Sequence, residues 1–194
     1  MCGLIGFLIL ALCAYFLIIF QNDWREIFLP KRFKKRNSES LPFKKCGRLV
    51  PGDLNVIIRE AADLYLESHQ GVTVTFLPDL SLPQIPLDRD QIKRVLINLL
   101  DNAVAAVGEK GKIDMSTSYN PELRLITCEV VDNGHGIAPE DRSRLFEPYF
   151  STKAAGTGLG LAIVNTIITD HQGFVRVRDN EPRGTRFVIE LPAG

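Results

Sequence analysis

The chain opens with an unbroken apolar run, and patterned segments follow it. Residues 1–20 carry no charged side chain, and a run of that length is long enough to cross a bilayer as a helix. A signal peptide, which would need a basic start and a clear cleavage site, and a buried helix of a soluble protein are the competing interpretations. We therefore expect a transmembrane helix over residues 1–22.

Beyond residue 47, apolar positions recur at helical spacing in three segments, which predicts helices over 54–67, 89–107 and 159–171. Asp53 is placed to cap the first helix, and Asp88 with Gln91 resembles a capping box before the second. Gly108 ends the second helix, and Gly173 is the expected C′ residue of the third.

Alternating and β-branched stretches predict strands over 72–77, 112–119, 123–132, 174–179 and 185–191. Between these elements we expect a loop over 78–86 and a short helix near 139–145. Strands and helices mix without regular alternation. The expected fold class is therefore α+β, a two-layer sandwich rather than a doubly wound sheet.

Charge divides the chain further. Lys and Arg number 23, and so do Asp and Glu, but residues 23–46 are basic and residues 47–194 are acidic. The basic cluster over 31–36 follows the apolar run closely, which is typical of the cytoplasmic side of a span and of contact with anionic lipid. We expect a basic juxtamembrane linker over 23–46 and a cytoplasmic body over 47–194, anchored in the inner (cell) membrane. An acidic body is not expected to bind nucleic acid.

The first chemical motif is the pair Asn98 and Asn102, which share one face of the helix over 89–107. Two amides among apolar neighbours are costly unless they are bonded. They are able to offer oxygens to Mg²⁺ and N–H groups to phosphate, although contacts between the helix and a loop would also explain them.

The second motif is Asp132-Asn133-Gly134-His135-Gly136, at the end of a predicted strand. It is an ordinary turn signal when taken alone. In a binding site, the Asp132 carboxylate would accept a hydrogen bond from an exocyclic amine such as adenine N6, and the two glycines would let the backbone pass beneath the ring.

The third motif, Gly156-Thr157-Gly158-Leu159-Gly160, opens the last predicted helix and suits an anion at a helix N-terminus. It is neither a Walker loop nor a dinucleotide fingerprint. The preceding stretch, Phe146–Lys153, offers aromatic anchors for a mobile loop and a lysine able to reach phosphate. Simple core packing is the alternative explanation for the aromatic residues.

Together, in this order, the four motifs resemble the ATP-binding catalytic domain of sensor histidine kinases, within the GHKL superfamily of gyrases, Hsp90 chaperones, mismatch-repair ATPases and kinases. The resemblance covers about 47–194 and is strongest to the nitrogen-regulation sensor kinases. It implies a Bergerat fold, with ATP and Mg²⁺ held between helices under a flexible lid.

Roles carry over by position. The resemblance implies catalytic roles for Asn98, Asn102 and Lys153, with Asn102 and Asn98 at the metal. It implies nucleotide contacts for Asp132, Gly134, Gly136, Phe146, Phe150, Gly156, Thr157, Gly158, Leu159 and Gly160. Asn98 stands where the gyrase-like hydrolases have a general base, and an amide cannot take a proton from water, so slow hydrolysis is expected.

The chain departs from a complete sensor kinase in lacking the two-helix domain that carries the phosphorylated histidine. Its histidines, His69, His135 and His171, have no acceptor context. We therefore expect a truncated or trans-acting form, which transfers the γ-phosphoryl group to a partner kinase or phosphoacceptor chain that serves a response regulator. A non-catalytic ATP-binding module and a slow ATPase remain the alternatives.

Overall fold

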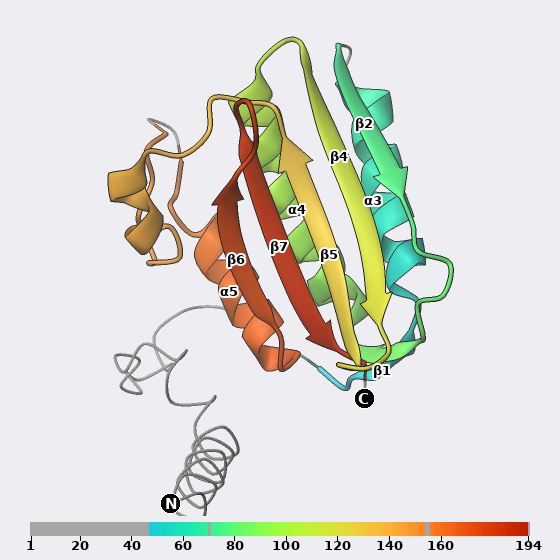
Figure 1. The fold of residues 1–194 in the computed structure, drawn as a ribbon. Helices are drawn as coiled ribbons and strands as arrows, with labels where there is room; N and C mark the ends of the chain where they lie inside the picture. Colours follow the sequence, from blue (N-terminus) through green and yellow to red (C-terminus); the bar gives the residue numbers. More distant parts are fainter. Residues whose placement is uncertain (1–46, 70, 154–155, 194) are drawn as a thin grey trace, which may run out of the picture. The chain divides into compact units, whose positions relative to one another are not determined.

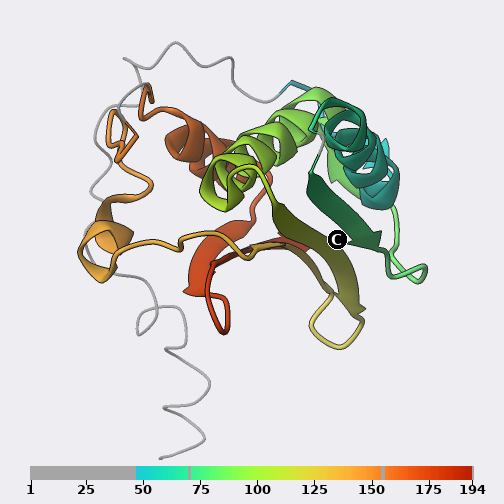
Figure 2. The same cartoon turned by 90° about the horizontal axis from the view of Figure 1, so that it is seen from above.

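The computed structural model describes residues 47–69, 71–153 and 156–193, which belong to one compact unit spanning Phe43–Gly194. In this part of the chain, three α-helices lie against one face of a five-stranded sheet (Figures 1 and 2). The helices are α3 (Leu54–Ser68), α4 (Arg89–Val107) and α5 (Gly160–Asp170). The two-layer α/β sandwich that the sequence predicts is confirmed.

The sheet has the strand order β2-β4-β5-β7-β6. β2 pairs parallel with β4, and every other neighbouring pair is antiparallel. The strands are β2 (Val72–Leu77), β4 (Gly111–Asn120), β5 (Leu125–Asp132), β6 (Phe174–Asp179) and β7 (Thr185–Pro192). A 3₁₀ helix, η1 (Pro139–Arg144), lies between β5 and α5.

Strict alternation along β5 explains why one face of the sheet is covered and the other is open. Ile126, Cys128 and Val130 are buried beneath the helices, whereas their neighbours are only partly covered. Burial raises the pKa of the Cys128 thiol to about 12, so this cysteine packs as a small apolar side chain. On the open face, ion pairs link Lys112 to Asp114, Arg176 to Glu190 and Arg186 to Glu129.

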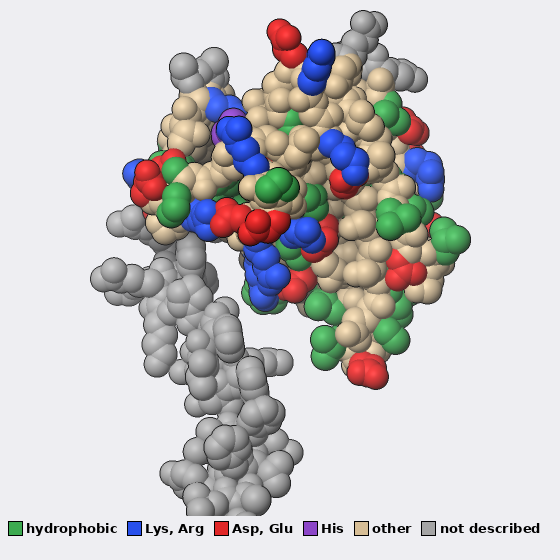
Figure 3. Space-filling model, turned by 45° about the horizontal axis from the view of Figure 1, so that its top comes forward, with side chains coloured by type: hydrophobic (Ala, Val, Ile, Leu, Met, Phe, Trp, Pro, Cys, Tyr) green, Lys and Arg blue, Asp and Glu red, His purple; other side chains and the backbone are tan. Residues whose placement is uncertain are grey.

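Figure 3 shows Lys and Arg side chains interspersed with Asp and Glu on the side that it presents. Among the described residues, no helix is both long and apolar enough to span a membrane. The expected transmembrane helix over 1–22 and the linker over 23–46 lie outside the described residues.

The expected loop over 78–86 is wrong at its end, because β3 (Ile85–Leu87) pairs antiparallel with β1 (Val50–Gly52) in a second, two-stranded sheet. Ile85 and Leu87 are buried in the main core, which explains why this short segment is extended and fixed. Its pairing partner lies more than thirty residues upstream.

The end of α5 also differs from expectation. Gln172, at φ 60°, is the left-handed C′ residue, and Gly173 follows it as C″, with its N–H bonded to Ile168 O at 2.9 Å. Gly173 is needed for another reason, since a Cβ there would lie 2.4 Å from the carbonyl oxygen of Glu190 on β7.

The helix starts follow the expected caps, with one change. Asp53 Oδ1 accepts from the N–H of Asn55, and Asp88 Oδ1 accepts from the N–H of Gln91. The return bond of a capping box is missing, because the Asp88 N–H donates to His171 Nε2. Gln91 Oε1 is consequently buried without a hydrogen-bond partner among the described residues.

Candidate functional site

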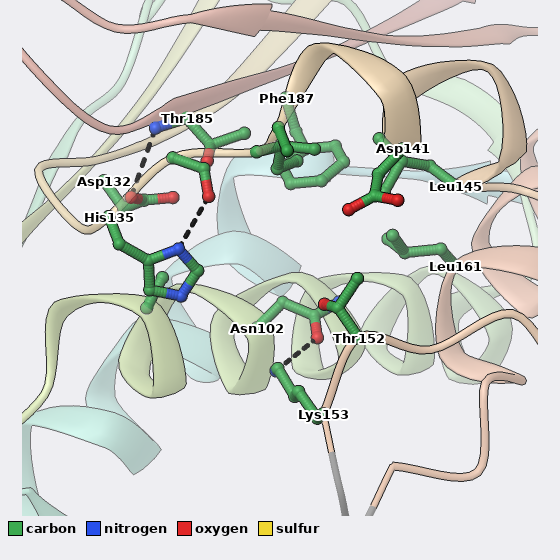
Figure 4. Close-up of a pocket in the computed structure, with 14 residues that line it drawn as sticks. Asn102, Asp132, His135, Asp141, Leu145, Thr152, Lys153, Leu161, Thr185 and Phe187 are labelled. Atoms are coloured by element: carbon green, nitrogen blue, oxygen red, sulfur yellow. Dashed lines mark hydrogen bonds between the residues drawn. The ribbon is translucent and has the colours of Figure 1, made fainter.

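Two adjoining cavities, of about 290 and 220 Å³, lie where α4 and α5 meet the segment that joins β5 to α5. Figure 4 shows the residues that line the larger one. We call the one that reaches Asp132 the first cavity and the one that reaches Gly158 the second. They share the lining residues Asn102, Leu145, Thr152, Lys153 and Leu161. The two cavities therefore adjoin each other, and we call them together the cleft; residues of each sequence motif line it.

Asp132 marks the sheet end of the first cavity. Its side chain is 3% exposed, and Oδ1 accepts from the N–H of Gly134 at 2.8 Å and of Thr185 at 3.2 Å. Burial raises the pKa of the Asp132 carboxyl, while these hydrogen bonds act in the opposite direction. The result is a rigidly held acceptor at the edge of an apolar space.

The turn between β6 and β7 supports Asp132 from behind. Asn180 Nδ2 donates to the Asp132 carbonyl oxygen at 3.0 Å, and a Cβ on Gly184, at φ 125°, would lie only 1.9 Å from that same oxygen. Arg142 of η1 donates a hydrogen bond through Nη2 to Asp179 Oδ1, 2.5 Å away at the end of β6, and so links η1 to this turn. No sequence motif indicates a function for these residues, although a glycine directly before Thr185 marks the close approach.

The two glycines of the Asp132 motif differ in what they do. Gly136, at φ 76°, lines the first cavity, whereas Gly134 packs against the last turn of α4, where a Cβ would lie 2.6 Å from the Ala106 backbone. His135 also lines the first cavity, with its Nδ1 2.7 Å from Gly136 O. Gly134 therefore positions the turn and is not part of the cleft wall.

The remaining wall of the first cavity is mostly apolar and was missed by sequence reasoning. Its further lining residues are Ala106, Ile137, Ala138, Asp141, Leu145, Leu161 and Phe187. These residues come from α4, the segment after β5, α5 and β7. A mostly apolar cavity with the buried Asp132 carboxylate at one end suits a planar heteroaromatic ring with an exocyclic amine.

Asn98 and Asn102 both face the cleft from α4, as the helical spacing predicts. Asn98 Nδ2 donates to the Arg94 carbonyl oxygen at 2.7 Å, and a Cβ on Gly160 would lie 2.8 Å from Asn98 Oδ1. Asn98 is thus fixed between its own helix and the start of α5. Asn102 lines both cavities and so lies at the middle of the cleft.

Lys153 reaches across the cleft from the loop. Its Nζ donates to Asn102 Oδ1 at 2.8 Å (Figure 4). Partial burial lowers the pKa of Lys153, and the charge of Asp101 acts against that change. The side-chain oxygen of Asn102 is therefore in contact with a cationic group.

The glycine-rich motif forms the wall of the second cavity through Gly156, Thr157, Gly158 and Gly160. Gly158, at φ 66°, accepts through its carbonyl oxygen from the Tyr149 N–H at 2.9 Å, which closes the base of the loop. Leu159 packs against the core and lines neither cavity. Its backbone begins α5, since its carbonyl oxygen accepts from the Ile163 N–H at 2.9 Å.

The two aromatic residues that were expected to anchor the loop lie in different surroundings. Phe150 lines the second cavity, and the Arg144 guanidinium lies 4.5 Å from the centre of its ring. Phe146 instead packs against the core and lines neither cavity. The core-packing alternative therefore describes Phe146, and only Phe150 meets the cleft.

Asp101 is a cleft residue that sequence reasoning missed. It lies on α4 between the two asparagines and lines the second cavity. Tyr65, buried on α3, donates its hydroxyl to Asp101 Oδ1 at 2.5 Å, and burial is the main cause of the raised pKa of Tyr65. The hydrogen bond fixes this carboxylate at the rim of the cleft.

Residues 87–194 match the protein family described as histidine kinase-, DNA gyrase B- and HSP90-like ATPases. Sensor histidine kinase ZraS of Salmonella typhimurium is 39% identical over 142 residues, which make up 72% of this chain and 30% of ZraS. Sensory histidine kinase/phosphatase NtrB of Azospirillum brasilense is 40% identical over 127 residues, 59% of this chain and 32% of NtrB. The chain thus spans about a third of the length of these relatives.

Solved structures agree with the sequence comparison. The nucleotide-free catalytic domain of histidine kinase ThkA superposes with TM-score 0.68 at 34% identity, covering 75% of this chain and 95% of that domain. Full-length ShkA in complex with AMPPNP gives 0.66 at 30% identity, covering 74% of this chain and 31% of ShkA. Histidine kinase ThkA in complex with the response regulator TrrA gives a TM-score of 0.65 at 32% identity, covering 75% of this chain and 42% of the ThkA chain.

Proposed function

Because the chain belongs to the family of histidine kinase-, DNA gyrase B- and HSP90-like ATPases, and its relatives are sensor histidine kinases, we propose that residues 47–194 bind ATP and deliver its γ-phosphoryl group to a histidine on a partner chain. One observation carries this proposal. The two adjoining cavities together reach from the buried Asp132 carboxylate, past Asn102, to the start of α5. That order matches a base, a cation and a phosphate chain.

The base occupies the first cavity in this proposal. Asp132 accepts from its exocyclic amine, while the apolar walls and Gly136 cover the ring. The Asp132 Oδ1 atom is already saturated by two backbone donors, so the carboxylate is oriented before the ligand arrives. ShkA, whose structure contains AMPPNP, supports nucleotide binding by this fold.

The phosphates and Mg²⁺ occupy the second cavity. Among the described residues, no group of three or more His, Cys, Asp or Glu would bind a metal ion by itself. The donor set nevertheless fits Mg²⁺ carried by a nucleotide, because Asn102 Oδ1 already contacts a cationic group, and Mg²⁺ accepts amide and phosphate oxygens. Asn98 and Asn102 would hold the ion, which neutralises phosphate charge when bound, and the N-terminus of α5 would receive phosphate oxygens.

Transfer is favoured over hydrolysis by Asn98. The Asn98 side-chain amide donates a hydrogen bond to the Arg94 carbonyl oxygen and lies against Gly160. An amide has no basic atom that could accept a proton from the attacking water. Bound ATP would then remain intact until an acceptor histidine is positioned beside it, since phosphoryl transfer depends on alignment and charge stabilisation. The competing function, a regulatory ATP-binding module without transfer, requires the same cleft and differs only in the presence of an acceptor.

The acceptor is assigned to another chain because the three histidines of this sequence are badly placed. His171 is buried beyond the far end of α5, and His135 lies beside Asp132 in the first cavity. His69 stacks on Tyr65 at the end of α3, with ring centres 5.3 Å apart. None of the three lines the second cavity. A response regulator would receive the phosphoryl group next, as the complex of ThkA with TrrA suggests for such kinases.

The test is to incubate the purified chain with radiolabelled ATP and a partner sensor kinase. The ATP site of this partner is disabled, but its acceptor histidine is intact. The purified chain should not label itself, and acid-labile phosphate should appear on the partner. Asn102→Ala should abolish that label, and Asp114→Asn on the open face should not. Acid-labile label on this chain alone would contradict transfer to a partner, and tight ATP binding without partner label would favour the regulatory module.

We further propose that the chain is anchored in the inner membrane by residues 1–22, with the catalytic domain in the cytoplasm and residues 23–46 against anionic lipid. The charge-free run and the cluster Lys31–Arg36 support this orientation. A reporter fused after Gly194 should be active only in its cytoplasmic form. Neutralising the basic cluster should weaken that bias, and reporter activity in the periplasm from the intact chain would overturn the orientation.

A further inference from the structure

The hydrogen bond from Lys153 to Asn102 uses the same Asn102 oxygen that would bind Mg²⁺ in the proposed metal site. Lys153 Nζ donates to Asn102 Oδ1 at 2.8 Å, and Figure 4 shows the ammonium of the loop residue meeting the amide of the helix residue. Asn102 is one of the five residues that line both cavities of the cleft. A lysine ammonium therefore lies where a divalent cation would bind.

A negative charge near the second cavity favours the ammonium at this position. Asp101 follows Asn98 by three positions on α4, lines the second cavity, and attracts Lys153 by its charge. Its Oδ1 is held by the Tyr65 hydroxyl at 2.5 Å, from a ring that is only 6% exposed. Asn102 accepts the hydrogen bond of the ammonium, and Asp101 on the same helix adds a fixed negative charge that attracts it.

We propose that the Lys153 ammonium and Mg²⁺ are alternative occupants of Asn102 Oδ1, with Lys153 as an internal cation that leaves when a metal–nucleotide complex enters. Tyr65 and Asp101 act as positioning residues for the ammonium. The released lysine is then available to phosphate oxygens in the second cavity. This inference rests on the proposed function, because it concerns the same site.

Mutual exclusion follows from distance and charge. Mg²⁺ binds oxygen at about 2.1 Å and an ammonium at about 2.8 Å, so both on one oxygen would lie within about 5 Å of each other. The repulsion between a divalent ion and an ammonium at that separation is strong in a partly desolvated cleft. Arrival of the metal thus requires the Lys153 side chain to leave Asn102 Oδ1.

Calorimetry with ADP tests the competition. We define the magnesium effect as the Kd of ADP in EDTA divided by its Kd in excess Mg²⁺, and ADP is chosen because it lacks the γ-phosphate that Lys153 would otherwise contact. Lys153→Met frees Asn102, so the magnesium effect should rise about three- to tenfold, the scale of one solvent-exposed charged hydrogen bond. Lys112→Met, which removes a lysine paired with Asp114 on the open face, should leave it unchanged. An equal or smaller magnesium effect in Lys153→Met would refute the competition.

A second measurement needs no ligand. In the nucleotide-free protein, the ¹H–¹⁵N signal of the Lys153 ammonium should be detectable, because its hydrogen bond slows the exchange of its protons with water. The Lys153→Met variant lacks this signal and so identifies it. Asn102→Ala should abolish this signal, and Tyr65→Phe should weaken it, because that variant releases Asp101 without changing any charge. The Lys112 signal serves as the internal control.

The two measurements separate this inference from the proposed function. If the wild-type protein binds no ADP or ATP, the proposed function fails, and the ammonium signal still decides whether Asn102 holds Lys153. If nucleotide binds normally while the Lys153 signal is unaffected by Asn102→Ala, the internal cation is refuted and the proposed function stands.

Discussion

His171 Nε2 accepts a hydrogen bond from the backbone N–H of Asp88 at 2.9 Å, joining the end of α5 to the start of α4. The other ring nitrogen, Nδ1, is 2.8 Å from the Ile167 carbonyl oxygen. A backbone N–H donates and a carbonyl oxygen accepts, so the imidazole is neutral and carries its proton on Nδ1. The ring is 4% exposed, and its two partners make it a structural link between two helices that build the cleft.

His171→Ala should lower the free energy of unfolding by about 1–3 kcal/mol, because it leaves the partly buried Asp88 N–H without its acceptor and removes packed volume from a buried site. Urea denaturation measures the change. Nucleotide affinity of the folded variant should stay near that of wild type, since Gly160 and the second cavity lie at the opposite end of α5. Unfolding within about 0.5 kcal/mol of wild type would show that the link carries no stability.

Gln172→Gly should raise the free energy of unfolding by about 1 kcal/mol. Gln172 occupies the left-handed region at φ 60°, which costs a residue with a Cβ but not glycine. The same urea titration applies, with Gln172→Ala as the matched control, because alanine keeps the Cβ and should show no gain. A destabilised Gln172→Gly would mean that the exposed glutamine side chain contributes more than the backbone strain removes.

The sequence predicted the elements well because their signals are local. The helix expected over 89–107 has the bounds Arg89–Val107, since its cap, its apolar spacing and its terminal glycine all lie within the segment. β3 was missed because its pairing with β1 and its burial depend on distant residues. Gly173 was assigned to the wrong cap position for a similar reason, since its real constraint is the approach of Glu190.

The site was predictable to the same degree. Asn98, Asn102, Asp132 and Lys153 were found because amides, a carboxylate and a lysine in these local patterns already indicate chemistry. Thr185 and Asp101 were missed, because one supports Asp132 across the sheet and the other is fixed by Tyr65 on a neighbouring helix. Leu159, Phe146 and Gly134 were expected to contact nucleotide but face the core or α4, a direction that a linear motif does not specify.

Asp132→Asn should weaken ATP binding by about 1.5–3 kcal/mol, roughly 10- to 150-fold, while the fold is retained. Asparagine keeps an oxygen for the N–H groups of Gly134 and Thr185, but it presents an amide donor where the carboxylate accepted from the base. Calorimetry with a nonhydrolysable ATP analogue measures the loss.

Base exchange sharpens the Asp132 test. An inosine nucleotide carries a carbonyl acceptor in place of the adenine amine, so Asp132→Asn should narrow or reverse the preference for adenine over hypoxanthine. Asp141→Asn, which changes another carboxylate of the same cavity, is the control and should keep the adenine preference. Equal losses for both bases in Asp132→Asn would remove Asp132 as the group that selects the base.

Gly160→Ala should disturb the cleft through Asn98. A Cβ at position 160 would lie 2.8 Å from Asn98 Oδ1, so either α5 or the amide must move, and nucleotide affinity should fall. Without that clash the substitution would favour α5, because alanine is better than glycine in a helix by about 1 kcal/mol. The double variant Asn98→Ala/Gly160→Ala should therefore be more stable than Asn98→Ala alone, whereas Gly160→Ala in the wild-type background should be less stable than wild type. Urea denaturation of the four proteins gives the coupling, expected at about 1–3 kcal/mol, and additive effects would show that Asn98 is not what requires glycine at the start of α5.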